Sequence, residues 1–256
     1  MIGAVLGDIA CSKWGTACTD IHFHPEAKLF QSDSFITDAT VMASATKWAI
    51  LSKISYADSY RLFHSFYPYD SYDSAFLSWI NDVPVQLCPC IIAGSAARAV
   101  YIGEHFSCEE RVIEEATKSA ACISDHPEVI LSAVTVALCT FYGKQGRSKA
   151  YLQDFVVQDA KYPLASSMSV LHQQVSHSFA AMPCQSPIPI SLSCFFLSED
   201  WESCIRNILS VNYSRAACGC IVGGIAEAFY GTTGMHAKLL LRRYVKDNRL
   251  FSLILK

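Results

Sequence analysis

Apolar residues recur at helical spacing along most of the chain, whereas stretches that alternate apolar and polar residues are scarce. A clear example is the series Val112, Ile113, Ala116, Ala120 and Ile123, which falls on one face of a helix. Other segments of the chain show apolar residues at the same helical spacing. The pattern therefore predicts an all-α fold.

Local signals mark where several of these helices start and end. Ser107 followed by Glu110 reads as a capping box, in which each side chain bonds the backbone amide of the other residue. Pro127 suits the first turn of the next helix, and Gly143 is expected to end it. Further helix starts are expected at Ser55, supported by Asp58, and at Ser148.

In the second half of the chain, three prolines within residues 183–189 predict a break rather than a helix interior. Helices are expected around 190–197, 201–209 and 215–229, the last closed by Gly231. This last helix contains glycines, which cost up to about 1 kcal/mol each inside a helix. We therefore expect it to pack tightly at the centre of the fold.

Composition sets the class of protein. Of 256 residues, 52% are hydrophobic and only 17% are charged, so much of the chain must face a core. No repeat, low-complexity segment or linker is evident, which predicts one domain over residues 1–256. The net charge is −3 and no basic cluster suggests a nucleic-acid partner. The basic residues of 238–246 are interpreted as the solvated face of a C-terminal helix.

No targeting or membrane segment is evident. The longest nearly apolar run, 129–142, is shorter than the roughly 20 residues that span a bilayer. Asp8 interrupts the apolar N-terminal stretch, and no charged region precedes it, as a signal peptide would require. These observations predict a cytoplasmic protein. The 12 cysteines are spread along the chain and include no Cys-x-x-Cys pair, so we expect small buried hydrophobes rather than a zinc site.

Four ordered stretches resemble the ADP-ribosylglycohydrolase family, which includes the dinitrogenase reductase-activating glycohydrolase. They are residues 2–10, 35–42, 67–98 and 205–231, and together they span nearly the whole chain. The resemblance implies a single compact multi-helix domain with a dinuclear Mg²⁺ or Mn²⁺ site between the N- and C-terminal motifs. It also implies hydrolysis of the bond that joins ADP-ribose to a protein side chain.

The metal motifs depart from the family pattern. Where the family reads Thr-Asp-Asp-Thr, Thr37 and Asp38 match but Ala39 replaces the second aspartate. The second motif, Asp-x-Asp-Thr, aligns with Ser214-Arg215-Ala216-Ala217, which lacks both carboxylates. A glutamate common after the first helix falls near Gly15. Thr37 and Asp38 are therefore interpreted as a vestigial metal site, and no cofactor is expected.

The substrate pocket that the resemblance implies is also altered. The family's Gly-Tyr-Gly phosphate loop aligns with Ser71, Tyr72 and Asp73, so carboxylates at Asp70 and Asp73 would repel a pyrophosphate. The asparagine of a Gly-Asn-Gly element becomes Ala93, before Gly94, and a histidine before the next helix becomes Ser124. We assign no catalytic residue.

Plain structural roles compete with functional ones. Thr37 or Asp38 can cap the helix that starts near Thr40, and Asp8 can bond locally or cap a neighbouring helix. The histidines are interpreted as surface or lightly buried residues: His22, His24, His172 and His177.

Three functions stay open. They are a non-catalytic binding or regulatory protein with a protein partner, an enzyme of other chemistry in the same cleft, and an ADP-ribosyl hydrolase with substitute ligands.

Overall fold

In the computed structural model, the described part of the chain comprises residues 1–14, 23–24, 26–69, 71–178, 187–211, 215–231 and 236–256, and most of it is helical. No strand occurs in these ranges, so the predicted all-α fold is confirmed. The first half contains α1 (Ile2–Ser12), α2 (Asp38–Ser52), α3 (Tyr56–Phe66), α4 (Ser74–Ile80), α5 (Pro89–His105), α6 (Glu109–Ala121) and α7 (Pro127–Lys144). The second half contains α8 (Lys149–Asp154), a π-helical turn (Phe155–Asp159), α9 (Met168–Ser178), α10 (Pro187–Phe196), α11 (Trp201–Ser210), α12 (Arg215–Tyr230), α13 (Ala237–Tyr244) and α14 (Asn248–Leu255).

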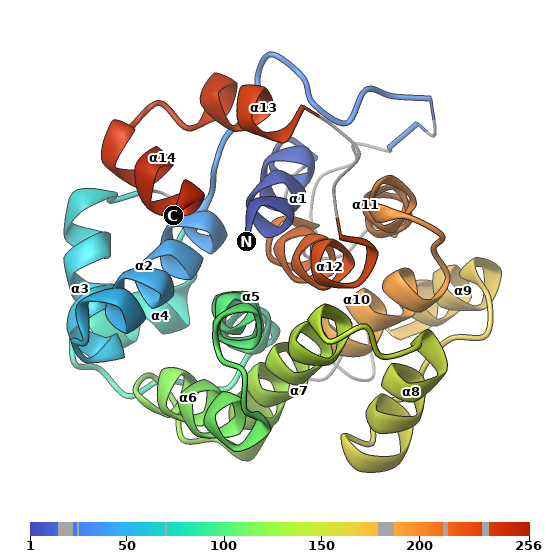
Figure 1. The fold of residues 1–256 in the computed structure, drawn as a ribbon, viewed down its shortest axis with the longest axis horizontal. Coiled ribbons are helices and arrows are strands. Elements are labelled where there is room, and N and C mark those ends of the chain that lie inside the picture. The colour runs from blue at the N-terminus through green and yellow to red at the C-terminus, as the bar shows by residue number, and fades with distance from the viewer. Residues whose placement is uncertain (15–22, 25, 70, 179–186, 212–214, 232–235) are drawn as a thin grey trace.

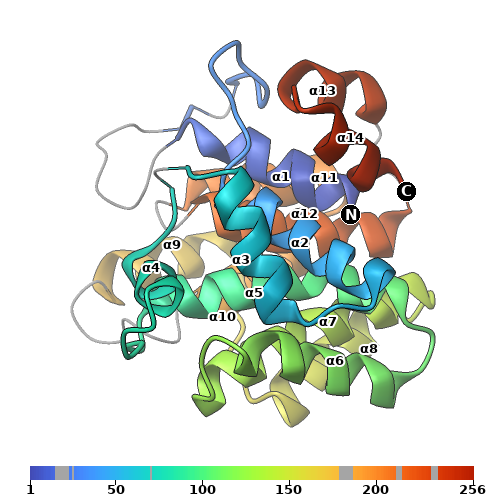
Figure 2. The same ribbon diagram turned by 90° about the vertical axis from the view of Figure 1, so that its left-hand side faces the viewer.

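Helices α1 and α12, from opposite ends of the chain, lie side by side at the centre (Figure 1). Helix α5 packs on α12 and on α7, while α2 and α3 cover one side and α10 and α11 the other. The buried apolar side chains form one continuous core through these elements. Both views place the two chain termini near each other (Figure 2).

Glycines allow α1 and α12 to approach at backbone distance. An ideal Cβ on Gly7 would lie 2.0 Å from the Gly219 carbonyl oxygen, and one on Gly223 would lie 2.3 Å from the Gly3 carbonyl oxygen. Real Cβ atoms do not come within 3.0 Å of another heavy atom. The expectation that the glycine-containing helix packs tightly at the centre is therefore confirmed.

Several predicted helix starts are confirmed by their caps. The Ser55 hydroxyl accepts from the Asp58 amide at the start of α3, and the Ser148 hydroxyl accepts from the Tyr151 amide at the start of α8. Pro127 is the first residue of α7, and Gly231 follows α12 with a φ of +85°.

Three expectations about helix ends were wrong. Helix α6 begins after Cys108, not Ser107, and Cys108 has no side-chain capping bond. Gly143 is buried inside the last turn of α7, and the left-handed residue that ends the helix is Gly146, with a φ of +73°. Helix α10 already begins at Pro187, because a proline in the first turn gives up no helical hydrogen bond.

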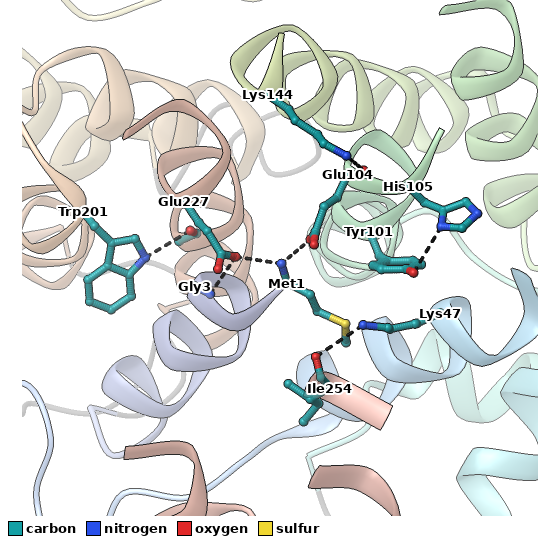
Figure 3. A network of polar contacts seen from close by, with 11 residues as sticks. Met1, Gly3, Lys47, Tyr101, Glu104, His105, Lys144, Trp201, Glu227 and Ile254 are labelled. Carbon is teal, nitrogen blue, oxygen red and sulfur yellow. Dashed lines mark hydrogen bonds and ion pairs between the residues drawn. The ribbon is translucent and has the colours of Figure 1, made fainter. Parts of the chain in front are cut away.

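At the end of the molecule that holds both termini, charged groups join helices distant in sequence (Figure 3). The Met1 ammonium group donates to Glu104 of α5 and, at 2.7 Å, to Glu227 of α12. Glu227 also accepts from the Gly3 amide at 2.8 Å, and buried Lys47 donates to the Ile254 carbonyl oxygen at 3.3 Å. These contacts tie α1, α2, α5, α12 and α14 together.

No helix in the described ranges combines the length and the apolar character needed to cross a lipid bilayer. The basic residues of the C-terminal segment are exposed, as expected: Lys238, Arg242, Arg243 and Lys246.

Candidate functional site

The buried carboxylate of Asp8, on α1, lies at the start of α2. Its Oδ1 accepts from the Thr37 hydroxyl at 2.7 Å. Its Oδ2 accepts from the Thr37 amide at 2.9 Å, the Thr40 amide at 3.3 Å and the Thr40 hydroxyl at 2.5 Å. Asp8 thus caps a neighbouring helix, one of the two roles expected for it. Burial raises the pKa of Asp8 to about 6, and these hydrogen bonds oppose that rise.

Thr37 is the N-cap residue of α2. Its hydroxyl accepts from the Ala39 amide at 3.1 Å while it donates to Asp8. Both contacts satisfy groups at the helix start, as an N-cap threonine commonly does. The capping role that competed with a metal role is confirmed for Thr37.

Asp38 is the first residue of α2, and its amide donates to the Ser71 hydroxyl at 3.0 Å. Burial raises the pKa of Asp38 to about 7, with a further rise from the negative charge of Asp8 and a smaller one from Asp73. A hydrogen bond from Ser71 opposes this. Asp38 therefore sits among like charges and is only partly ionised near neutral pH.

We expect Asp38→Asn to stabilise the protein at pH 8. The ionised carboxylate is disfavoured in the folded state, because its pKa is raised from 3.8 to about 7. Folding stability therefore falls as pH rises between these values, and the full penalty applies above about pH 7. Asparagine cannot ionise and so removes this penalty. Because Asp38 is partly exposed to solvent, we expect the free energy of unfolding to rise by about 1–2 kcal/mol. Urea unfolding at pH 4 and pH 8 measures the difference.

The matched control for this variant is Asp33→Asn. The Lys13 hydrogen bond lowers the pKa of exposed Asp33, so neutralising Asp33 should give no stabilisation at pH 8. A gain from Asp38→Asn that is the same at both pH values would contradict the titration argument.

The residues aligned with the family's phosphate loop have local structural partners. The Tyr72 hydroxyl donates to the Tyr67 carbonyl oxygen at 3.0 Å, and the Tyr72 ring is buried against Phe76. The Asp73 carboxylate accepts from the Phe76 amide at 2.9 Å and so caps α4. The structure brings Ser71 and Asp73 close to Asp38, but it uses Tyr72 and Asp73 to hold α4.

Other predicted pocket residues lie apart from Asp38. Ala93 is buried inside α5, and Gly94 is half-buried on the same helix. Ser124 lies between α6 and α7, where it lines a groove of about 460 Å³ together with Trp79, residues 82–85, Ala121, Ile123 and Asp125. This groove does not include Asp38, Ser71 or Asp73.

The start of α5 was missed by the sequence reasoning. Cys88 is half-buried and Cys90 is exposed, although we expected buried cysteines. A hydrogen bond from the Cys90 thiol lowers the pKa of Cys88. The same hydrogen bond and burial raise the pKa of Cys90, and the charges of Asp73 and Asp38 add to that rise. These thiols therefore lie near the carboxylates. Cys108 is also exposed, whereas the expectation of burial is confirmed for Cys11, Cys139, Cys194, Cys204, Cys218 and Cys220.

The remaining sequence candidates offer little chemistry. His24 and His172 are exposed, and the His172 ring bonds the Ser210 hydroxyl at 3.0 Å. Several candidates lie outside the described residues: Gly15, His22, Asp70, Ser214 and the side chains of Arg215 and His177.

The metal-ligand atoms among the described residues do not fit a dinuclear magnesium or manganese centre. Ala39 has no ligand atom, and neither has Ala216 or Ala217 in the first turn of α12. Burial raises the pKa of Cys220 and the charge of Asp8 adds to it, so this part of α12 does face the carboxylates. Within the described ranges, no group of three or more His, Cys, Asp or Glu residues could hold a metal ion. Hard divalent cations need more oxygen ligands than this.

Three comparisons with known proteins bear on the fold and the family of this chain. A search of curated proteins finds no match. Among solved structures, one chain described as "ADP-ribosylglycohydrolase-related protein complex" superposes with a TM-score of 0.66 at 16% identity, covering 99% of this chain and 95% of that one. At that identity, the likeness shows the fold alone. The model of the ADP-ribosylglycohydrolase family matches residues 1–253. The chain therefore belongs to the ADP-ribosylglycohydrolase family.

Proposed function

We propose that this chain is a non-catalytic member of the family, which has lost the dinuclear metal site and acts as a binding or regulatory protein. The observation that carries the proposal is the state of the carboxylates near the start of α2. Asp8 accepts four hydrogen bonds from Thr37 and Thr40, and Asp73 caps α4. Among these three described carboxylates, Asp38 is then the one left to bind a cation.

The charge of the available carboxylates also argues against a dinuclear metal site. Two divalent cations carry four positive charges, and carboxylates normally supply the ligands that offset them. Asp38 can contribute one negative charge, and its pKa of about 7 reduces even that near neutral pH. A protein with so few metal ligands is suited to binding a partner with this fold rather than to metal-dependent hydrolysis. We propose a protein as its partner and the cytoplasm as its location.

We expect neither Mg²⁺ nor Mn²⁺ at millimolar concentration to raise the melting temperature by more than about 1 °C, with or without ADP-ribose. A ligand that binds the folded state stabilises it in proportion to the logarithm of its concentration above Kd. Differential scanning fluorimetry over a concentration series measures this, with Ca²⁺ at equal ionic strength as the control. A rise that grows with both metal and ADP-ribose would overturn the proposal.

The alternative is a hydrolase that removes ADP-ribose from protein side chains with substitute ligands. One observation favours it: Asp8 and Asp73 both raise the pKa of Asp38, so three carboxylates lie close enough to interact. Uncompensated negative charge of this kind can attract a cation. Activity without any substitution would support this alternative.

Ala39→Asp is expected to restore no hydrolysis by itself. It supplies the missing carboxylate of the first motif, but Ala216 and Ala217 still lack ligand atoms at the second. Release of ADP-ribose from an ADP-ribosylated protein, followed by chromatography with Mg²⁺ or Mn²⁺ present, measures the outcome. The matched control is Ala43→Asp, one turn further along α2, which puts a carboxylate at a buried position away from the motif. Measurable turnover by Ala39→Asp would show that the second motif is not needed.

A further inference from the structure

Arg98, on α5, is a buried cation that has no acidic partner among the residues that the structure describes. Only 4% of its surface is exposed. Its Nη2 donates to the Ser95 hydroxyl at 2.8 Å, and its guanidinium carbon lies 5.1 Å from the centre of the Tyr60 ring. Its Nε has no hydrogen-bond partner. In the described part of the chain, no carboxylate pairs with Arg98.

This arrangement leaves the guanidinium incompletely satisfied. An arginine side chain carries five N–H donors, and buried charges in proteins are normally paired and hydrogen-bonded. The Tyr60 ring offers a cation–π contact but accepts no directed hydrogen bond from Nε. The Ser95 hydroxyl is neutral. No carboxylate in the described ranges therefore offsets the charge of Arg98, and its Nε donor is unused.

Gly94, one turn before Arg98 on α5, lies beside the Nη1 group of Arg98. Apart from its chain neighbours and the backbone of its own helix, an ideal Cβ on Gly94 would meet one described heavy atom within 4 Å, namely Arg98 Nη1 at 3.5 Å. Gly94 is half-buried, so solvent reaches this part of α5. A small group that binds beside Gly94 would thus contact Arg98 Nη1 first.

The positive charge also lies close to the groove that Trp79 and Ser124 line. The Trp79 ring packs edge-on against the Tyr60 ring at 6.5 Å. The positive charge of Arg98 opposes the burial that raises the pKa of both Tyr60 and Cys122. Cys122 lies between the groove residues Ala121 and Ile123. Tyr60 therefore contacts both Arg98 and the groove residue Trp79.

We propose that Arg98 anchors a binding site for an oxyanion, a carboxylate or phosphate group, beside Gly94. A guanidinium presents paired N–H donors that match two oxygens of such a group, and the pair is stronger where water is excluded. The Ser95 hydroxyl, beside Nη2, can donate a proton to the same anion. The site does not depend on the state of the metal motif.

The test uses the full chain with sodium phosphate and sodium acetate, each compared with sodium chloride at equal ionic strength. We expect one of the two oxyanions to raise the melting temperature by at least about 2 °C, with saturation. The anion that gives the larger response identifies the source, phosphate or carboxylate. The shift should vanish in Arg98→Met and weaken in Arg98→Lys, which keeps the charge but lacks the paired donors.

Arg111→Met is the matched control, because Arg111 is exposed and paired with Glu114 on α6, so its variant should keep the shift. An equal shift in wild type and Arg98→Met, or no saturable shift with either anion, would overturn the proposal. If Arg98→Met does not fold, the wild-type chain is labelled with ¹⁵N-arginine and titrated. A saturable movement of the Arg98 Nε resonance, assigned with Arg98→Lys, supports the site, and a resonance that does not move refutes it.

Discussion

Asp8→Ala is expected to lower the free energy of unfolding by about 3–5 kcal/mol. The substitution removes the acceptor for two amides and two hydroxyls at Thr37 and Thr40, all at the buried start of α2. Each buried donor left without a partner costs about 1–3 kcal/mol, although the hydroxyls can turn to other acceptors. Losses above about 4 kcal/mol are exceptional and mark a broken buried network. Urea unfolding at pH 7.5 measures the loss.

Two variants test whether the hydrogen bonds are the cause. Asp8→Asn keeps one acceptor oxygen and nearly the same volume, so its loss should be about half that of Asp8→Ala. Asp125→Ala removes an exposed aspartate and should change stability by no more than about 0.5 kcal/mol. If Asp8→Ala cost less than about 1 kcal/mol, the start of α2 would not depend on Asp8.

The sequence predicted the helices well, because their signals are local. The helical spacing of apolar residues, together with Pro127 and the capping hydroxyl groups, predicted the starts of α3, α7 and α8 to within a residue or two. The errors in the helix ends arose where two nearby residues could each start or end the helix. The capping pattern of Ser107 and Glu110 favoured Ser107 as the last residue before α6, but that residue is Cys108, which makes no side-chain capping bond. Helix α7 runs one residue past Gly143 to Lys144, and Gly146 takes the left-handed conformation, whereas Gly143 packs against Phe229.

The candidate site was predicted less completely, because it depends on contacts between distant segments. The sequence allowed Asp8 a capping role, but it could not show which helix Asp8 caps, since Thr37 lies 29 residues away. Burial of a polar residue is likewise not visible locally. The exposed thiol of Cys90 and the unpaired guanidinium of Arg98 became apparent only when α3, α5 and α6 were assembled.

The assembly itself depends on the contact between α1 and α12, which explains why glycine is required in both helices. Gly7→Ala should lower the free energy of unfolding by about 3 kcal/mol or more. The added methyl group would lie 2.0 Å from the Gly219 carbonyl oxygen and 2.8 Å from its carbon. These are backbone atoms, so no side chain can rotate away and the two helices must separate. Separation would open the core around Ile205, which also lies within 3.3 Å of that position.

Gly94→Ala on α5 distinguishes this steric effect from the general effect of replacing a helical glycine. Alanine is favoured over glycine by up to about 1 kcal/mol inside a helix, so both variants gain that amount locally. At Gly94 the new Cβ makes an ordinary contact of 3.5 Å with Arg98, and Gly94→Ala should be neutral or stabilising. Urea unfolding of the two variants against wild type should therefore give changes of opposite sign or very different size. Equal changes would mean that α1 can shift along α12 at little cost, and that the close approach of Gly7 and Gly219 does not fix the centre of the fold.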